Sequence, residues 1–295
     1  MIVDLLTGIV GAANVLVGDA IPDDYTHDES LGAVPTRPLA VVRPANTAEV
    51  AAVVAACHEH HVPLTARGAG TGLSGACIAR ADGVVLSTER MNRILEVDLD
   101  NHVAVVQAGV RLFELDEATA AHGLVYPVYP GEYSASLGGN VATNAGGMRA
   151  VKYGVTRHQV LGLEAVLPTG EVIRTGGKFV KATTGYDLTQ LIIGSEGTLA
   201  LVTEATLRLY PRAPHTATVL APFATLSDVT HAIPRIVASG VGPMILEYID
   251  MITLSAITAH VGLDLGIPEE IQASAHAYLV VMMEQNSDSR LDEDV

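Results

Sequence analysis

Residues 64–75 read Leu-Thr-Ala-Arg-Gly-Ala-Gly-Thr-Gly-Leu-Ser-Gly, and from residue 68 onward all except Leu73 are small or carry a hydroxyl group. Gly70, Gly72 and Gly75 fit the GxGxxG pattern of the Rossmann fold. That fold needs a helix directly after the glycines, whereas here the strand-like run 84–86 follows without room for one. We therefore exclude a Rossmann fold and predict a glycine loop between two strands, whose backbone N–H groups can hold a pyrophosphate. The alternative is a glycine-rich hairpin without a ligand.

A second glycine-rich segment spans residues 130–147 and reads Pro-Gly-Glu-Tyr-Ser-Ala-Ser-Leu-Gly-Gly-Asn-Val-Ala-Thr-Asn-Ala-Gly-Gly. Its two Gly-Gly pairs allow the backbone to approach a flat ring closely. Asn140, Thr143 and Asn144 offer neutral hydrogen-bonding groups to a heterocycle and to hydroxyl groups. The alternative is a flexible surface loop, but the apolar Leu137 and Val141 argue against it. A third segment, 185–199, contains the turn Gly-Ser-Glu-Gly-Thr just before a predicted strand.

The flanking sequence predicts a mixed α+β layout. Short β-branched runs indicate strands at 39–43, 62–65, 84–86, 102–107, 199–209 and, as two strands joined by a turn, 161–174. Helical spacing of apolar residues predicts one helix that begins at the N-cap Thr47 and another over 112–122. Beyond a boundary at the proline-rich stretch 211–214, we expect strands at 216–222, 244–249 and 277–283, and helices at 226–239 and 269–276. We also expect a short packed helix over 4–17 and a mobile acidic tail over 286–295.

Composition narrows the class of protein. The chain has 295 residues, 49% of them apolar, which is enough to bury a core. Its 17 Lys and Arg against 33 Asp and Glu argue against a nucleic-acid or anionic-membrane partner. Cys57 and Cys77 lack the spacing of a zinc site, and this usage favours a reducing, cytoplasmic compartment. We find no basic signal-peptide region and no apolar stretch long enough to span a membrane, and we expect a soluble protein.

Four motifs in a fixed order point to one family. They are residues 67–75, residues 138–147, Lys-Tyr-Gly at 152–154 with 160–164, and Thr-Gly-Tyr-Asp-Leu at 184–188 with 193–198. In these motifs the chain resembles the FAD-linked oxidases of the vanillyl-alcohol oxidase or p-cresol methylhydroxylase type. Within that family it is most similar to the group of the glycolate oxidase flavin subunit, D-lactate dehydrogenase and D-2-hydroxyglutarate dehydrogenase. The resemblance runs from about Tyr25 to Val281.

The resemblance implies an α+β fold in which residues 1–212 form a two-subdomain PCMH-type FAD-binding domain. Residues 213–295 would form the N-terminal part of an α+β substrate (cap) domain. Members of this group are longer, and their metal-binding His pair and catalytic His lie in the later part of that domain. The substrate domain is therefore expected to be truncated here, with its catalytic residues and metal ligands outside these 295 residues.

The resemblance also implies the cofactor and its contacts. FAD would lie with its pyrophosphate on the first glycine segment, its flavin along the second, and its adenosine near the turn 194–198. The implied contacts are Arg67, Gly68, Ala69, Gly70, Thr71, Gly72, Leu73, Ser74, Pro130, Gly131, Ser136, Gly138, Gly139, Ala142, Thr143, Asn144, Gly146, Gly147, Tyr153, Gly154, Glu196, Gly197 and Val202. Some relatives bind the flavin covalently through a His in or near the first loop. Residues 67–75 contain no His or Cys, so we predict non-covalent FAD and interpret Cys77 as a small buried residue.

The implied activity is oxidation of a 2-hydroxy acid of the D-lactate, glycolate or D-2-hydroxyglutarate class. A hydride would pass from the α-carbon to flavin N5 while a base takes the hydroxyl proton. The resemblance also implies that the chain works with a partner subunit or with an electron acceptor. Two alternatives stay open. One is a flavin-binding subunit or fragment without activity of its own, and the other is a nucleotide-sugar reductase of the same fold.

For several other residues the sequence allows both a functional and a structural role. His58, His60 and His61 could share a metal ion, but a solvated helix end is the preferred interpretation. His158 fits a polar surface better than a flavin site. The local basic cluster of Arg149, Lys152 and Arg157 could contact FAD phosphates or attract an anionic substrate. Tyr248 could belong to the core or face the flavin.

Overall fold

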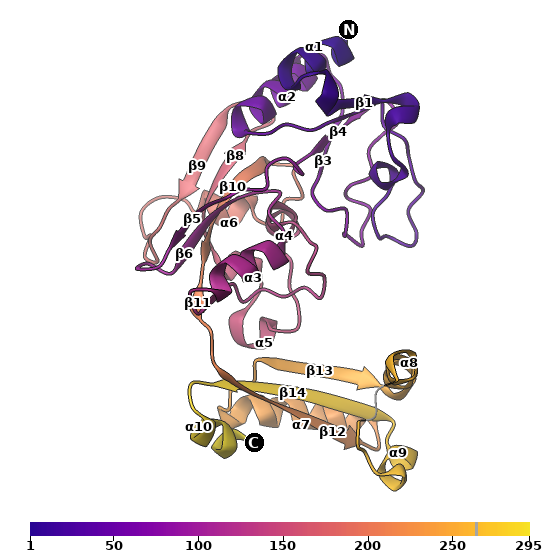
Figure 1. The fold of residues 1–295 in the computed structure, drawn as a ribbon, viewed down its shortest axis with the longest axis vertical. Coiled ribbons are helices and arrows are strands. Elements are labelled where there is room, and N and C mark those ends of the chain that lie inside the picture. Colours follow the sequence, from indigo (N-terminus) through magenta and orange to yellow (C-terminus); the bar gives the residue numbers. More distant parts are fainter. Residues whose placement is uncertain (263–264) are drawn as a thin grey trace. The chain divides into compact units, whose positions relative to one another are not determined.

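The structure is a computed structural model that describes residues 1–262 and 265–295, and it divides into two compact units. The first unit comprises Met1–Ala145 and Val155–Pro211. The second comprises Gly146–Gly154 and Arg212–Val295. The chain therefore leaves the first unit once for a short excursion, returns to it, and leaves it again after Pro211 (Figure 1).

The first unit begins with a four-stranded sheet in the order β1-β2-β4-β3. Its strands are β1 (Val15–Val17), β2 (Ala40–Val42), β3 (Leu64–Arg67) and β4 (Val84–Ser87), and the last three run parallel. Helices α1 (Ile2–Val10) and α2 (Thr47–Glu59) pack on this sheet. Leu6 of α1 and Val50 and Val53 of α2 form its buried core with the apolar strand residues. Three short 3-10 turns, η1 (Ala12–Asn14), η2 (Gly18–Ala20) and η3 (Asp23–Thr26), belong to the same region.

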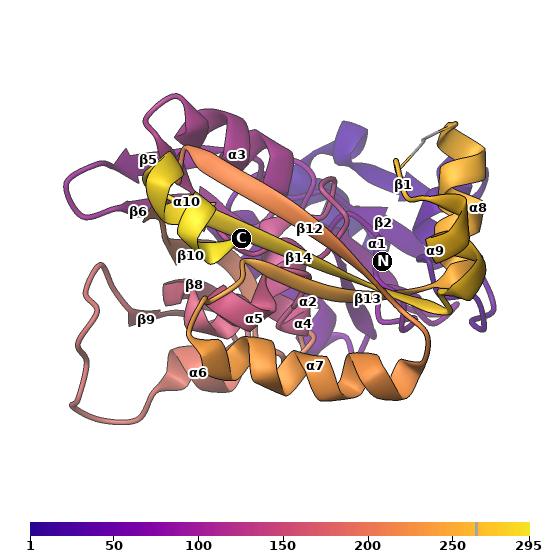
Figure 2. The same ribbon diagram turned by 90° about the horizontal axis from the view of Figure 1, so that it is seen from below.

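A five-stranded antiparallel sheet in the order β5-β6-β10-β8-β9 completes the first unit. Its strands are β5 (Ile94–Asp98), β6 (Val103–Gln107), β8 (Val160–Val166), β9 (Val172–Gly176) and β10 (Leu201–Arg208). Helices α3 (Leu112–Ala120), α4 (Leu137–Thr143) and α6 (Leu188–Ile192) share its core, and a long loop joins β9 to α6 (Figure 2). The short strands β7 (Leu124–Val125) and β11 (Tyr210–Pro211) pair with each other, and the 3-10 turn η4 covers Thr156–His158.

The second unit is built on a three-stranded antiparallel sheet in the order β12-β14-β13. Its strands are β12 (His215–Phe223), β13 (Ile245–Asp250) and β14 (Ala277–Gln285). Helix α7 (Leu226–Ser239) packs on one face through Val229, which shares a buried cluster with Leu279 and Val281 of β14. The remaining helices are α5 (Ala150–Tyr153), α8 (Met251–Val261), α9 (Glu269–Ser274) and α10 (Asp288–Asp294). Among the described residues, no helix is long and apolar enough to cross a membrane.

The mixed α and β class is confirmed, but several local predictions are wrong. The helix predicted over 4–17 ends at Val10, because Gly11 takes a left-handed φ of 84°, and residues 15–17 form a strand instead. The N-cap of α2 is Asn46 and not Thr47, since the Asn46 side chain accepts a hydrogen bond from the Glu49 N–H at 2.9 Å. The tail that we expected to be mobile contains α10, which buries Leu291, and Gln285 Nε2 donates to Asp294 at 2.6 Å. Helices α4 and α8 were not expected.

Candidate cofactor-binding site

Two adjoining hollows lie in the first unit where its glycine segments meet. The smaller has an open volume of about 750 Å³ and the larger about 1410 Å³. They share Gly68, Ala76, Cys77, Gly139 and Thr143 on their walls, so we treat them as one groove. A groove formed by two adjoining hollows suits an elongated ligand.

The glycine loop after β3 forms one wall of the groove. It connects the parallel strands β3 and β4, as the sequence predicted. Residues 68–74 all line the larger hollow. A β-carbon at Gly68 would overlap the Ser136 hydroxyl group, and Gly70 has a left-handed φ of 78°. Glycine is therefore needed here for close packing and for backbone conformation.

A buried cation supports this loop. The Arg67 side chain is only 7% exposed, and its guanidinium lies against the backbone of Gly70. Arg67 Nη1 donates to the His27 carbonyl oxygen at 2.6 Å, and the guanidinium stacks over the Tyr25 ring at 5.5 Å. The Glu29 N–H donates to the Gly72 carbonyl oxygen at 2.9 Å. The segment 25–29 thus holds the loop through Arg67 and Gly72, and no sequence motif predicted this support.

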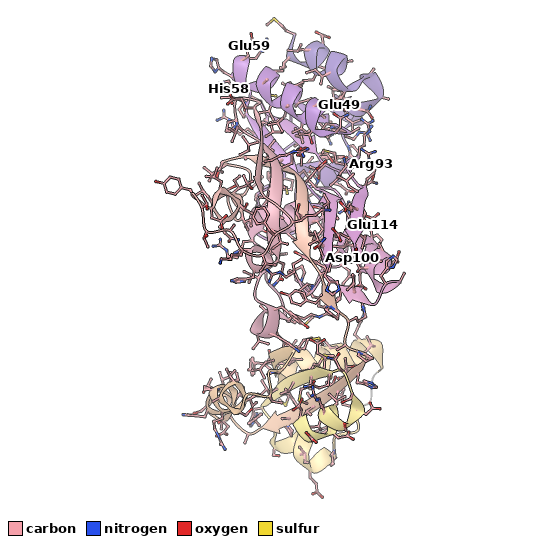
Figure 3. The ribbon with its side chains drawn as sticks, turned by 90° about the vertical axis from the view of Figure 1, so that its left-hand side faces the viewer. Glu49, His58, Glu59, Arg93, Asp100 and Glu114 are labelled. Atoms are coloured by element: carbon pink, nitrogen blue, oxygen red, sulfur yellow. The ribbon has the colours of Figure 1, made fainter. Side chains whose placement is uncertain are left out.

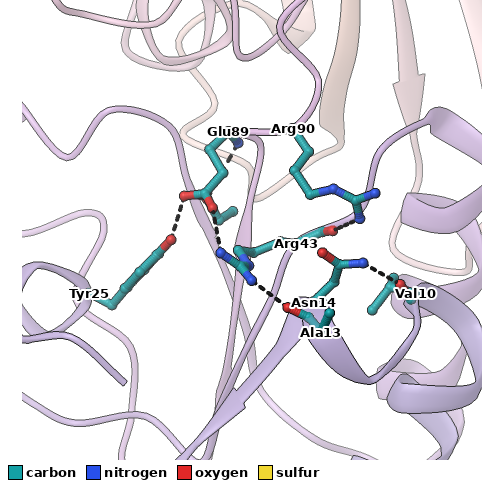
Figure 4. Close-up of polar contacts among 8 residues, drawn as sticks. Val10, Ala13, Asn14, Tyr25, Arg43, Glu89 and Arg90 are labelled. Atoms are coloured by element: carbon teal, nitrogen blue, oxygen red, sulfur yellow. Dashed lines mark hydrogen bonds and ion pairs between the residues drawn. The ribbon is translucent and has the colours of Figure 1, made fainter. Parts of the chain in front are cut away.

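The Tyr25 ring is held in turn by a small polar network (Figure 4). Its hydroxyl group donates to Glu89, which also pairs with Arg43 Nη1 at 3.2 Å. Burial, together with the hydrogen bond and the charge of Glu89, raises the pKa of Tyr25 to about 12. Arg43 Nη2 reaches the Ala13 carbonyl oxygen at 2.5 Å (Figure 4). The network therefore ties the glycine loop to the β1–β2 edge of the first sheet.

Helix α4 forms the opposite wall. The Ser136 hydroxyl caps it by accepting from the Gly139 N–H at 3.2 Å, and Leu137 and Val141 are fully buried. A β-carbon at Gly138 would lie 2.6 Å from that of Ala108, so the helix can approach β6 only with glycine there. Asn140 is 4% exposed and borders the larger hollow, and its Nδ2 has no hydrogen-bond partner among the described residues. A buried unpaired donor beside a groove is a candidate contact for a ligand acceptor.

The turn 194–198 and the start of β10 line the smaller hollow. Two N–H groups of this turn, from Gly194 and Glu196, donate to carbonyl oxygens of α4 at 3.0 and 2.9 Å. Glu196 has a left-handed φ of 52°, and the Ser195 hydroxyl is buried without a partner in the described structure. Val202 adds to a lining that is mainly small, apolar side chains and backbone.

Most of the residues implied by the family resemblance lie along this groove. The residues on its walls are Arg67, Gly68, Ala69, Gly70, Thr71, Gly72, Leu73, Ser74, Pro130, Ser136, Gly138, Gly139, Ala142, Thr143, Glu196, Gly197 and Val202. Two others within the first unit are not among the residues that line it. Gly131 is absent from its lining, and Asn144 caps α4 in a left-handed conformation with φ 50°. Gly146, Gly147, Tyr153 and Gly154 belong to the second unit.

The groove also contains residues that sequence reasoning left out. Cys77 lines both hollows, and burial raises the pKa of its thiol, although the nearby Arg67 charge opposes that shift. Ala66, Ser195 and Thr203 line the smaller hollow. The composition of 130–147 had pointed to Asn140 as a polar contact. Ala66, Cys77 and Ser195 lie in or beside the quoted glycine motifs, whereas Thr203 carries no sequence signal, because only the folded chain brings its strand to the glycine loop.

The other open candidates fall outside the groove. His58 lies with Glu59 at the exposed end of α2 (Figure 3), and His61 has a left-handed φ of 54°. The described residues contain no group of three or more His, Cys, Asp or Glu that could hold a metal ion. His158 is exposed, and its Nδ1 accepts from the Val155 N–H at 3.0 Å. Tyr248 is 41% exposed on β13 and so is not a core residue.

The predicted basic cluster is divided between the units. Arg149 and Lys152 belong to the second unit, whereas Arg157 belongs to the first. Lys152 Nζ pairs with Glu284 at 3.0 Å. Its charge is therefore neutralised within the second unit.

Comparison with known proteins gives two family matches. Residues 38–176 match the family described as an FAD binding domain, and residues 212–295 match the C-terminal domain of FAD linked oxidases. An uncharacterized FAD-linked oxidoreductase of Mycobacterium tuberculosis is 59% identical over 97% of this chain and 62% of its own length. A D-lactate dehydrogenase of Anaerostipes hadrus is 40% identical over 96% of this chain and 60% of its own length.

A glycolate oxidase subunit of Bacillus subtilis is 41% identical over 84% of this chain and 52% of its own length. The chain thus spans between about half and three fifths of these curated relatives. Among solved structures, an alkyldihydroxyacetonephosphate synthase matches 99% of the chain with a TM-score of 0.84 and 22% identity, over 57% of its own length. p-Cresol methylhydroxylase with substrate bound matches 99% with a TM-score of 0.82 and 19% identity, over 62% of its own length. At these identities the two structures establish the fold alone.

Proposed function

The chain belongs to the FAD-linked oxidoreductases that include D-lactate dehydrogenases and glycolate oxidase subunits, and we propose that its groove holds FAD for oxidation of a 2-hydroxy acid. The observation that carries this proposal is the groove itself. It combines a glycine loop, an apolar hollow, and buried polar atoms without partners in the described structure, namely Asn140 Nδ2 and Ser195 Oγ. These features fit a dinucleotide with a flat ring at one end.

Each part of the groove suits a different part of FAD. Residues 68–74 would hold the pyrophosphate through backbone N–H groups, and the buried Arg67 supplies positive charge behind them. The smaller hollow at Glu196, Gly197 and Val202 would take the adenosine part. The larger hollow along α4 would take the ribityl chain and the flavin, with Asn140 Nδ2 donating to one of their acceptors. Binding would be non-covalent, and Cys77 would lie beside the cofactor with its thiol protonated.

The bound flavin supplies the hydride acceptor for the α-carbon of the substrate. The described residues of this chain bind and orient the cofactor, and we assign none of them as the base. We propose residues 1–212 as the FAD-binding domain and residues 213–295 as the beginning of the substrate domain. D-Lactate and glycolate are the first substrates to test, because relatives carry them in their names. We also propose that the chain works with a partner subunit or an electron acceptor. We propose a cytoplasmic location, and the free thiols of Cys57 and Cys77 agree with a reducing compartment.

The alternative is a flavin-binding chain without turnover of its own. It is suggested by the comparison with the curated relatives, since the chain spans between about half and three fifths of their length. None of the relatives named above is a nucleotide-sugar reductase, so we do not develop that alternative. The proposed oxidoreductase and the flavin-binding chain without turnover share the FAD groove and differ only in catalysis.

A visible spectrum and an activity assay separate these functions. Purified chain, reconstituted with FAD, is expected to show oxidised-flavin bands and to release all flavin on acid or heat treatment. D-Lactate, glycolate and D-2-hydroxyglutarate would then be tested with an artificial electron acceptor, with and without divalent metal. We expect negligible turnover by this chain alone. Robust turnover would place the catalytic groups within these 295 residues, and failure to bind FAD would refute the proposed function.

A further inference from the structure

The chain between α4 and β8 makes an excursion whose two ends are fastened together in the first unit. The Ala145 carbonyl oxygen accepts from both the N–H and the hydroxyl of Thr156, at 3.0 and 2.7 Å. Asn144 Oδ1 accepts from the Arg157 N–H at 2.9 Å. These three hydrogen bonds close the base of the excursion directly after α4. We call residues 144–157 the strap.

The tip of the strap is fastened to the second unit. Glu284, near the end of the central strand β14, accepts from the Tyr153 hydroxyl and pairs with Lys152 Nζ at 3.0 Å. The Glu284 side chain is only 11% exposed and that of Lys152 is 32% exposed. A mostly buried carboxylate with two donors is costly to leave unpaired. The contact is therefore a specific attachment and differs from an exposed surface ion pair, which contributes little.

The base of the strap leads directly to the groove. Asn144 is both the left-handed C-cap of α4 and the residue that binds the Arg157 N–H. Helix α4 carries Asn140 and Thr143 on the groove wall, and its carbonyl oxygens hold the turn at Gly194 and Glu196. Asn144 thus connects the strap to α4, which forms one wall of the groove and holds the turn at Gly194 and Glu196.

We propose that the strap couples FAD binding to the order of the second unit's sheet, with Glu284 as the positioning residue that fixes its tip. The inference rests on the proposed FAD site. Because binding linkage is reciprocal, loosening the tip must weaken FAD affinity, and bound FAD must stabilise the strands to which the tip is attached. Glu284 itself is absent from the groove lining, so a direct ligand contact does not explain such an effect.

The test compares Glu284→Gln and Tyr153→Phe with the control Asp288→Asn in the full chain. Asp288 belongs to the same unit and pairs with His215 Nδ1 at 2.5 Å, but its side chain is 79% exposed. FAD affinity is measured from flavin fluorescence, and amide hydrogen exchange of β14 is followed with and without FAD. We expect Glu284→Gln to weaken FAD binding about fivefold or more, at the low end of usual coupling strengths. Tyr153→Phe leaves Lys152 in place and should give a smaller loss.

In the wild type and in Asp288→Asn, FAD should slow exchange of residues 277–285, and in Glu284→Gln this protection should be lost. Wild-type affinity and protection in Glu284→Gln would overturn the coupling while leaving the proposed function intact. If Glu284→Gln does not fold, unchanged affinity in Tyr153→Phe overturns it in the same way. A wild-type chain that binds no FAD would overturn the proposed function and the coupling together.

Discussion

The guanidinium of Arg67 lies against the backbone of Gly70, at the position that a β-carbon on residue 70 would occupy. The cation and the glycine are therefore mutually dependent. Arg67 can stay buried under the loop only because residue 70 has no side chain. The loop keeps its left-handed conformation at Gly70 over a charge that is itself held by His27 and Tyr25.

Gly70→Ala is expected to destabilise the protein by about 1–3 kcal/mol, because it adds a strained φ and displaces a buried cation. FAD binding should be lost or strongly reduced. Gly72→Ala is the matched control: its φ is not left-handed, and a β-carbon there would lie 3.5 Å from Asp28 Oδ2, an ordinary contact. Thermal unfolding and flavin fluorescence check both variants. Equal stability of the two would contradict the role assigned to Arg67.

Asn140→Leu separates a ligand contact from a structural one. The buried Asn140 Nδ2 has no partner among the described residues, so its removal should leave the stability of the flavin-free chain unchanged or slightly higher. A lost hydrogen bond to the ligand is worth about 0.5–1.5 kcal/mol, which corresponds to up to roughly a tenfold loss of FAD affinity. Parallel unfolding and FAD titration measure the two effects. Unchanged FAD affinity would remove Asn140 from the proposed site.

Cys77 should report on occupancy of the groove. Burial raises the pKa of its thiol, so little thiolate is present near neutral pH and alkylation should be slow, then accelerate as the pH rises. Bound FAD should slow it further. Cys57 is the internal control, since burial raises the pKa of its thiol to about 11 and it lies outside the groove. Mass spectrometry of the labelled peptides distinguishes the two cysteines, and FAD-insensitive labelling of Cys77 would argue against the site.

Ionisation of the Tyr25 hydroxyl should lower the free energy of unfolding at high pH. Its pKa is raised from 10.0 to about 12 in the folded protein, so its contribution is complete below pH 10 and is lost between pH 10 and 12. Two pKa units correspond to about 2.7 kcal/mol, which solvent screening at this half-buried site reduces to about 1 kcal/mol. Denaturant unfolding of the wild type and Tyr25→Phe across this range measures the difference. The free energy of unfolding of the wild type, relative to that of Tyr25→Phe, should fall by about 1 kcal/mol between pH 10 and 12, and a constant offset would contradict the assignment.

Local sequence pattern predicted much of the fold. Helix α7 has the predicted bounds Leu226–Ser239, since Thr225 caps it and Gly240 ends it. The glycine loop lies between two strands, because the spacing from Gly75 to Val84 leaves no room for a helix. Helix α4 was missed because the glycines at 138 and 139 lower helix propensity, and its stability comes from the burial of Leu137 and Val141 instead.

The site was predicted in part, and the gaps have a common cause. The composition of the glycine segments predicted that they belong to the site. The contacts by which Tyr25 and His27 hold Arg67 join residues about 40 positions apart, so the sequence pattern did not predict them. Tyr153 was expected to contact the cofactor because the family resemblance implies it. Its hydroxyl donates to Glu284, a partner 131 residues away that no local pattern reveals.

The excursion at 146–154 means that the second unit is not encoded by one continuous stretch of sequence. A piece expressed from residue 212 onward would have every strand of its sheet. It would nonetheless lack Lys152 and Tyr153, and the carboxylate of Glu284 would lose both donors. Dissection of this protein at the proline-rich boundary would therefore yield two defective halves. The better complement to residues 212–295 is a synthetic peptide covering 146–154, supplied separately to restore the missing contacts.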